Sequence, residues 1–178
     1  MKTKRTVAIF VMTVLAAVSI YGQSASKHSE KTKSAMPKFE GTWVLNREKS
    51  SGLTGALGNA EIHMVVNQDS NQLSADQKII IRNREQSSQE LIYKLDGSDN
   101  EVEVSRPMAG TMKLKARWLE GSKTLELQST ITGENEGKPV TITTHEQWQL
   151  VGDDTLKIIR NRKSPQGIQT FRLLFQKQ

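Results

Sequence analysis

The chain has no cysteine, few aromatic residues and no long stretch with helical periodicity. None of its 178 residues is cysteine, which excludes disulfide bonds, thiolate-based zinc sites and a lipid-modified cysteine anchor. Aromatic residues make up only 5% of the sequence. Because nucleic-acid-binding proteins usually combine a basic patch with interleaved aromatic side chains, this composition argues against a nucleic acid as the partner.

The positive charge of the chain is confined to its N-terminal part. The formal net charge is +6. Seven of the 25 lysines and arginines precede position 39, whereas only one of the 19 acidic residues does. From Phe39 onward, 18 basic residues balance 18 acidic ones, so the folded part is predicted to be electrically neutral.

Residues 1–22 have the pattern of an export signal. Lys2, Lys4 and Arg5 precede an apolar run over residues 7–20, and small or polar residues follow it. The run of about 14 residues is short for a membrane span, which needs about 20. We therefore predict a signal peptide over residues 1–22 and a periplasmic or secreted location. An uncleaved membrane anchor is the alternative.

Residues 23–38 are rich in lysine and serine and are predicted to form a flexible basic linker. A linker of this charge would contact an anionic membrane surface weakly. That contact and an uncleaved signal are the two membrane contacts that the sequence suggests.

From residue 39 to residue 178, apolar and polar residues alternate in about ten short segments. Sequential hairpins without a helical return form a meander, which loses its exposed edges when it closes into a barrel. We predict one all-β domain over residues 39–178, a single antiparallel up-and-down β-barrel of about 8–10 strands. A sandwich of two sheets is the alternative.

Tight turns predict which residues face each other, because a slip of one residue moves every side chain to the other face. The clearest hairpin joins residues 111–120 to residues 123–132 through Gly121 and Ser122, a two-residue turn that suits glycine at its first position. The pairs predicted in this way are Trp118 with Leu125, Met112 with Ile131, Val66 with Leu73, Tyr93 with Val104, Leu95 with Val102, Ile131 with Val140, Leu150 with Leu156, Trp148 with Ile158 and Glu146 with Arg160. For the last turn two registers stay open: a two-residue loop pairs Arg160 with Phe171, and a type I turn with a bulge shifts that pairing by one.

The segment Phe39-Glu40-Gly41-Thr42-Trp43 resembles the Gly-x-Trp opening of lipocalins. The chain also resembles exported bacterial proteins that begin with Gly-Thr-Trp-x-Leu, then Asn or Asp, then Lys-Ser. The resemblance implies a lipocalin-like barrel in which Trp43, beside Gly41, closes the floor and an arginine from a late strand packs over it. The chain lacks the Thr-Asp-Tyr signature of lipocalins and an obvious C-terminal helix, so the resemblance implies the fold rather than the function.

One predicted strand places a carboxylate on its apolar face. Between residues 140 and 150 the alternation turns Glu146 inward, and the next hairpin sets Arg160 opposite Glu146 and Arg162 opposite Thr144. An isolated buried charge is very costly, whereas a hydrogen-bonded pair is tolerated. Either Glu146 and Arg160 form a structural pair, with Arg160 over Trp43 as the resemblance implies, or the arginines receive a ligand.

In the ligand interpretation the barrel keeps a partly wet cavity. Arg160 or Arg162 binds an anionic head group beside Glu146, and the side chains predicted around the tail are Trp118, Trp148, Tyr93 and Met112. The sequence thus predicts an exported, non-enzymatic barrel that binds a small hydrophobic or amphipathic ligand. The alternative is a solidly packed barrel without a ligand, a structural or interaction module of the cell envelope.

Residues typical of catalysis or of metal binding are sparse. His63 and His145 alternate with the apolar residues of their strands and are predicted to face solvent, and His28 falls in the linker. Their spacing matches no metal site, and no strand-to-helix turn presents a nucleophile. We predict no enzyme activity, no metal and no cofactor. The sequence predicts no particular oligomeric state.

Glycine-rich residues 50–59 follow the tryptophan strand. They are either a mobile lid over the mouth of the barrel or an ordinary connection between strands. They do not form a phosphate loop, because no Lys-Ser or Lys-Thr ends the segment and no helix follows it.

Overall fold

The computed structural model describes residues 36–119, 121, 123–135 and 137–178. The predicted signal peptide and most of the predicted linker lie outside these residues. The strands are β1 (Gly41–Leu45), β2 (Glu61–Gln68), β3 (Gln72–Ile81), β4 (Arg84–Lys94), β5 (Asn100–Val104), β6 (Gly110–Trp118), β7 (Leu125–Asn135), β8 (Lys138–Val151), β9 (Thr155–Ser164) and β10 (Gly167–Lys177), with one short 3-10 helix, η1 (Gly55–Asn59). None of the helical segments in the described part of the chain has the length and hydropathy of a membrane span.

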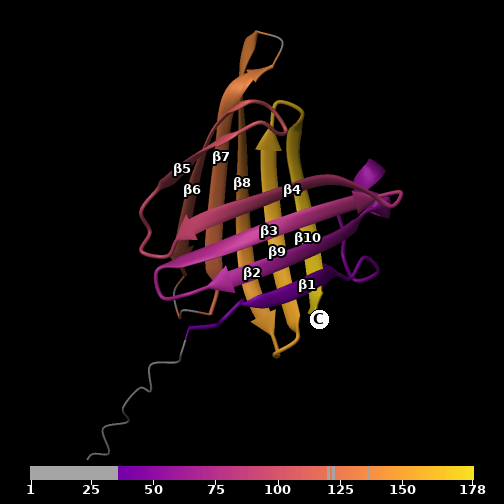
Figure 1. Ribbon diagram of the computed structural model, residues 1–178, viewed down its shortest axis with the longest axis vertical. Coiled ribbons are helices and arrows are strands. Elements are labelled where there is room, and N and C mark those ends of the chain that lie inside the picture. The colour runs from indigo at the N-terminus through magenta and orange to yellow at the C-terminus, as the bar shows by residue number, and fades with distance from the viewer. Residues whose placement is uncertain (1–35, 120, 122, 136) are drawn as a thin grey trace, which may run out of the picture. The chain divides into compact units, whose positions relative to one another are not determined.

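All ten strands belong to one antiparallel sheet, in the order β4-β3-β2-β1-β10-β9-β8-β7-β6-β5. The prediction of an all-β, up-and-down antiparallel fold is confirmed. Because β1 pairs with both β2 and β10, the last strand returns beside the first and the two-sheet sandwich is wrong. Figure 1 shows the sheet curled, so that β1 to β4 run across the direction of β7 to β10. The end strands β4 and β5 approach each other along a seam.

Three hairpins have the predicted registers. Trp118 faces Leu125 and Met112 faces Ile131 across β6 and β7. The remaining confirmed pairs are Leu150 with Leu156, Trp148 with Ile158 and Glu146 with Arg160, across β8 and β9. Of the two registers left open for the last turn, the two-residue loop is the one present, with Arg160 opposite Phe171.

Two predicted hairpins are shifted by two residues. Val66 faces Ala75 instead of Leu73, because the carboxylate of Asp69 accepts main-chain hydrogen bonds from the two residues after Ser70 and moves the turn one position onward. These hydrogen bonds also lower the pKa of Asp69. Similarly, Ile131 faces Ile142 instead of Val140. A shift of two residues keeps each side chain on its predicted face, so the core is unchanged.

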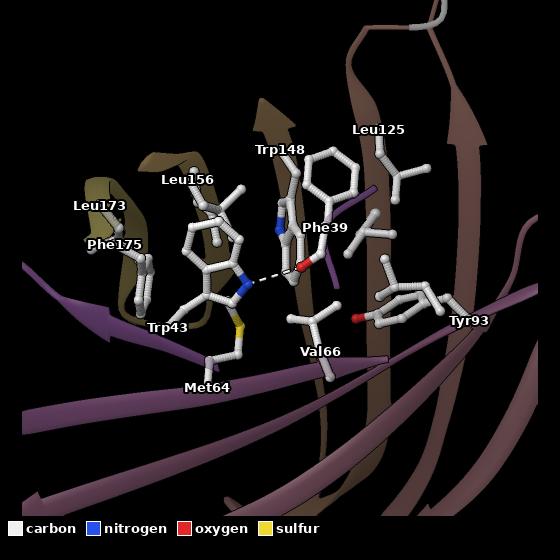
Figure 2. Close-up of a cluster of buried hydrophobic side chains, with 14 of the residues drawn as sticks. Phe39, Trp43, Met64, Val66, Tyr93, Leu125, Trp148, Leu156, Leu173 and Phe175 are labelled. Carbon is white, nitrogen blue, oxygen red and sulfur yellow. Dashed lines mark hydrogen bonds between the residues drawn. The ribbon is translucent and has the colours of Figure 1, made fainter. Parts of the chain in front are cut away.

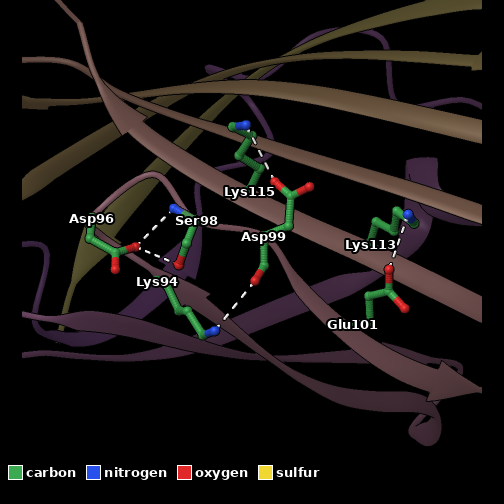
Figure 3. Close-up of polar contacts among 7 residues, drawn as sticks. All are labelled: Lys94, Asp96, Ser98, Asp99, Glu101, Lys113 and Lys115. Carbon is green, nitrogen blue, oxygen red and sulfur yellow. Dashed lines mark hydrogen bonds and ion pairs between the residues drawn. The ribbon is translucent and has the colours of Figure 1, made fainter.

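The predicted hairpin between β4 and β5 is wrong. Tyr93 does not pair with Val104, nor Leu95 with Val102; in the described part of the chain β4 pairs with β3, and β5 pairs with β6. The connection folds on itself, since the main chain and hydroxyl of Ser98 donate to Asp96. Asp99 of the connection and Glu101 of β5 pair with lysines of β6, as Figure 3 shows; these pairs are Asp99 with Lys115 at 3.3 Å and Glu101 with Lys113 at 3.0 Å. Cross-strand ion pairs of this kind favour β6 as the partner of β5.

Aromatic side chains fill the barrel at the end where β1 begins, here called the closed end. Phe39, Trp43, Trp148 and Phe175 are buried there and lie near one another in Figure 2. Phe39 stacks on Trp118, with ring centroids 5.9 Å apart, and meets Trp148 edge-on at 5.8 Å. The indole Nε1 of Trp43 donates to the main-chain oxygen of Phe39 at 2.9 Å. This packing and hydrogen bond close the floor of the barrel.

The cation over Trp43 comes from the last strand. Lys177 Nζ lies 5.4 Å from the centroid of the Trp43 ring, within the range of a cation–π interaction. Lys177 therefore has the place that was predicted for Arg160, which bonds to Glu146 instead. A Cβ atom on Gly41 would lie 2.6 Å from Lys177 Cε, so the glycine of Gly-x-Trp leaves room for the lysine.

The glycine-rich segment after β1 is fixed to the sheet. Ser51 forms an isolated bridge with Arg172 of β10, and Leu53 and Leu57 pack against the core. Gly52 has a φ of 86°, and a Cβ atom there would lie 2.3 Å from the main-chain oxygen of Thr170. These contacts favour the interpretation of the segment as an ordinary connection.

Replacement of Gly52 by alanine should destabilise the protein by about 2 kcal/mol more than replacement of Gly55. Both glycines have positive φ, but a Cβ atom on Gly55 meets nothing within 4 Å. Comparison of the two alanine variants therefore separates the cost of the steric clash at Gly52 from the cost of backbone strain, which both variants share. Urea unfolding of the two variants gives the comparison, and equal losses would contradict the close approach of Gly52 to β10.

Candidate functional site

Above the aromatic floor the barrel keeps a cavity of about 370 Å³. Strands β3 and β4 form one wall, strands β6 to β9 form the other, and the loop between β5 and β6 contributes the third side. The lining residues are Gln77, Gln89, Leu91, Tyr93, Arg106, Pro107, Met112, Ser129, Ile131, Ile142, Thr144, Glu146, Arg160 and Arg162. The volume lies within the range of small-molecule sites, roughly 300–1,000 Å³.

Glu146 and Arg160 form a partly buried ion pair at the base of this cavity. Arg160 Nε donates to Glu146 Oε1 at 2.5 Å, and the side chains are 23% and 11% exposed. The other carboxylate oxygen of Glu146 accepts a hydrogen bond from Trp148 Nε1 at 2.6 Å. Arg160 also reaches across the barrel, where its Nη2 lies 3.5 Å from Gln77 Oε1. Both oxygens of Glu146 and two nitrogens of Arg160 are therefore engaged with protein atoms.

Arg162 lies two residues beyond Arg160 on the same face of β9 and opposite Thr144. It is half-buried, and within the described residues it forms no hydrogen bond or ion pair. Arg162 also borders an adjoining cavity of about 260 Å³, which is lined further by Pro107, Met108, Val140, Ile142, Pro165 and Gln166. This second cavity marks the open end of the barrel, beside the turn between β9 and β10.

The charges around the main cavity sum to an excess of positive charge. Arg160 neutralises Glu146, whereas Arg162 and Arg106 have no carboxylate partner within the described part of the chain. The guanidinium of Arg106 donates to the main-chain oxygen of Gln86 on β4 at 2.6 Å. Two uncompensated cations in one cavity favour an anionic ligand.

Tyr93 reaches the cavity from β4, on the wall opposite Arg162. It is 5% exposed, and its hydroxyl has no hydrogen-bond partner among the described residues. Burial raises the pKa of Tyr93 above its ordinary value of 10.0, and the Glu146 carboxylate raises it further. The hydroxyl is therefore protonated at neutral pH and available as a donor.

The other predicted ligand residues are divided between the cavity and the closed end. Met112 lines the main cavity. Trp148 borders a smaller inner cavity of about 140 Å³, together with Tyr93, Glu146 and Arg160. Trp118 lies at the closed end against Phe39, outside the lining of the main cavity. Gly41 and Trp43 belong to the closed end as described above.

The cavity residues that were not predicted as ligand contacts include Gln77, Gln89 and Arg106. On β3, Gln77 follows Leu73 and Ala75 at every second position, so the alternation places its side chain on the inner face. A polar residue on the inner face of a strand is the same pattern that identified Glu146. On β4, Gln89 precedes Leu91 and Tyr93 at every second position, so the alternation could also have predicted that Gln89 faces inward. Arg106 lies in a loop, where no periodicity predicts the direction of a side chain.

The two histidines among the described residues lie away from the cavity, and His28 lies outside these residues. His145 is exposed, and His63 is partly exposed and bonds to Glu61 at 2.6 Å. In the part of the chain that the structure describes, no three His, Cys, Asp or Glu side chains are placed to hold a metal ion.

The chain is similar in structure to the zebrafish ileal bile acid-binding protein complexed with cholic acid. The identity is 12%, the TM-score is 0.46, and the match covers 79% of this chain and 98% of the other. No protein-family model matches the chain, and no curated protein matches it. The lipocalin resemblance stays a prediction, and the function proposed below rests on the side chains around the cavity.

Replacement of Arg160 by methionine should lower the free energy of unfolding by about 3 kcal/mol, because Glu146 then lies buried without a counter-ion. Adding Glu146→Gln should restore most of the loss, since the glutamine is uncharged and still accepts the hydrogen bond from Trp148. Urea unfolding of the two single variants and the double variant measures the coupling. A double variant that is less stable than Arg160→Met would contradict the structural role of the pair.

Proposed function

We propose that the barrel binds a small amphipathic anion and catalyses no reaction. The observation that carries the proposal is the cavity of about 370 Å³ with Arg162 on its wall. An arginine without a carboxylate partner in a half-buried position is costly, and a bound anion supplies the missing charge. Apolar side chains such as Leu91, Met112 and Ile142 line the same cavity and suit the apolar part of the ligand.

Arg162, rather than Arg160, is the residue that holds the anion in this proposal. The Nε atom of Arg160 is committed to Glu146, so the net charge of that pair is zero. Arg162 offers a free guanidinium fork, which matches a carboxylate in geometry and charge. The Glu146–Arg160 pair then has the structural role. Of the two interpretations drawn from the sequence, the structural pair applies to Arg160 and the binding of a ligand applies to Arg162.

Replacement of Arg162 by glutamine should weaken the binding of dodecanoate at least about tenfold, because a charge-assisted hydrogen bond is lost. The matched control is Lys163→Gln, which removes the same charge from the next residue, on the exposed outer face of β9. Isothermal titration calorimetry should show unchanged affinity for the control, and urea unfolding should show both variants close to the wild type in stability. Equal affinity of wild type and Arg162→Gln would overturn the role of Arg162, and no binding to either protein would favour the solidly packed envelope module.

We also propose that the protein is exported, with residues 1–22 removed and residues 23–38 serving as a basic linker. The support is the basic start of the chain followed by a short apolar run. The protein recovered from the periplasm or medium should begin near residue 23 in N-terminal sequencing. A full-length chain in the cytoplasmic or membrane fraction would contradict export and cleavage.

A further inference from the structure

The cavities inside the barrel follow one another from the open end to the aromatic floor. Arg162 is shared by the outer cavity and the main cavity. Tyr93 is shared by the main cavity and the small inner cavity, which is bordered by Met64 and Trp148. A ligand that is held at Arg162 and extends inward therefore reaches Tyr93 with its other end.

The inner end of this path is polar but carries no net charge. Glu146 and Arg160 neutralise each other there. Gln77 and Gln89 line both the main and the inner cavity, as Tyr93 does, and they add neutral amides to the walls of these cavities. The inner end therefore does not suit a second charged group, and a purely apolar tail would leave these polar groups without partners.

Among the residues that the structure describes, the Tyr93 hydroxyl has no hydrogen-bond acceptor. Tyr93 is 5% exposed, and its hydroxyl donates no hydrogen bond to any described residue. No fully enclosed side-chain polar atom in this part of the chain lacks a partner, so the hydroxyl has contact with the cavity space. Since burial keeps the phenol protonated, the hydroxyl donates to whatever oxygen the ligand presents.

We propose that the ligand is an anion with a second, uncharged oxygen-bearing group at its far end, which Tyr93 recognises by a hydrogen bond. The acid group lies at Arg162, and the hydroxyl or carbonyl group lies between Tyr93 and the neutral amides. This inference rests on the proposed function, because it assumes that an anion enters the cavity. It adds a selectivity: a simple fatty acid is a poorer ligand than one oxygenated at its far end.

The test compares straight-chain carboxylates from hexanoate to dodecanoate with their ω-hydroxy counterparts, using calorimetry at neutral pH. At the chain length that fits best, the wild type should bind the hydroxylated acid about tenfold more tightly, the value of one well-placed buried hydrogen bond. Tyr93→Phe should lose this preference and keep its affinity for the plain acid. Met112→Leu, which changes the wall of the same cavity without changing its hydrogen bonds, should keep the preference.

The stability of Tyr93→Phe gives a second readout. Because the hydroxyl has no protein acceptor, its removal should leave the urea midpoint unchanged or raise it. A lower midpoint would indicate a structural hydrogen bond and would overturn the assignment of Tyr93 as a ligand contact.

The outcomes separate the two proposals. Binding that depends on Arg162 but shows no preference for the hydroxylated acid at any length overturns the role of Tyr93 alone. A preference that persists in Tyr93→Phe does the same. Failure of every carboxylate to bind overturns this inference together with the proposed function.

Discussion

The ion pair between Glu146 and Arg160 is the interaction on which the interior of this protein depends. The alternation of β8 and β9 places both side chains inside the barrel, where neither charge is stable alone. Trp148 satisfies the second oxygen of the carboxylate, and this bond ties the pair to the aromatic floor. The pair thus forms the boundary between a packed lower half and a polar upper half.

The two halves serve different purposes. Below the pair, Phe39, Trp43 and Trp148 pack closely and supply apolar burial to a barrel that has no disulfide. Above it, the cavity has polar side chains from several strands and two arginines without carboxylate partners in the described part of the chain. Polar groups of this kind cost stability when they have no partner, so their convergence in one cavity supports the proposal that the cavity binds a ligand.

Three hairpins were predicted correctly from the sequence. The pairings of β6 with β7, β8 with β9 and β9 with β10 followed from short connections of two to six residues, and they brought Glu146 and Arg160 together. Alternation could not predict that β4 and β5 separate, because that result depends on contacts of Asp99 and Glu101 with a later strand. Nor could it predict that Lys177 covers Trp43, since the pairing of β1 with β10 joins segments far apart in the sequence. Arg106 reaches the cavity from a loop, where side-chain direction follows from tertiary contacts alone.

The central claim is that the cavity above the ion pair takes an anion. Native mass spectrometry of the protein purified from its own source, without denaturation or delipidation, tests it most directly. The wild-type protein should carry a bound small molecule with an acid group, and the Arg162→Gln protein prepared in the same way should show the bare mass. A bare mass for the wild-type protein under gentle ionisation, or an equal ligand load on both proteins, would contradict it.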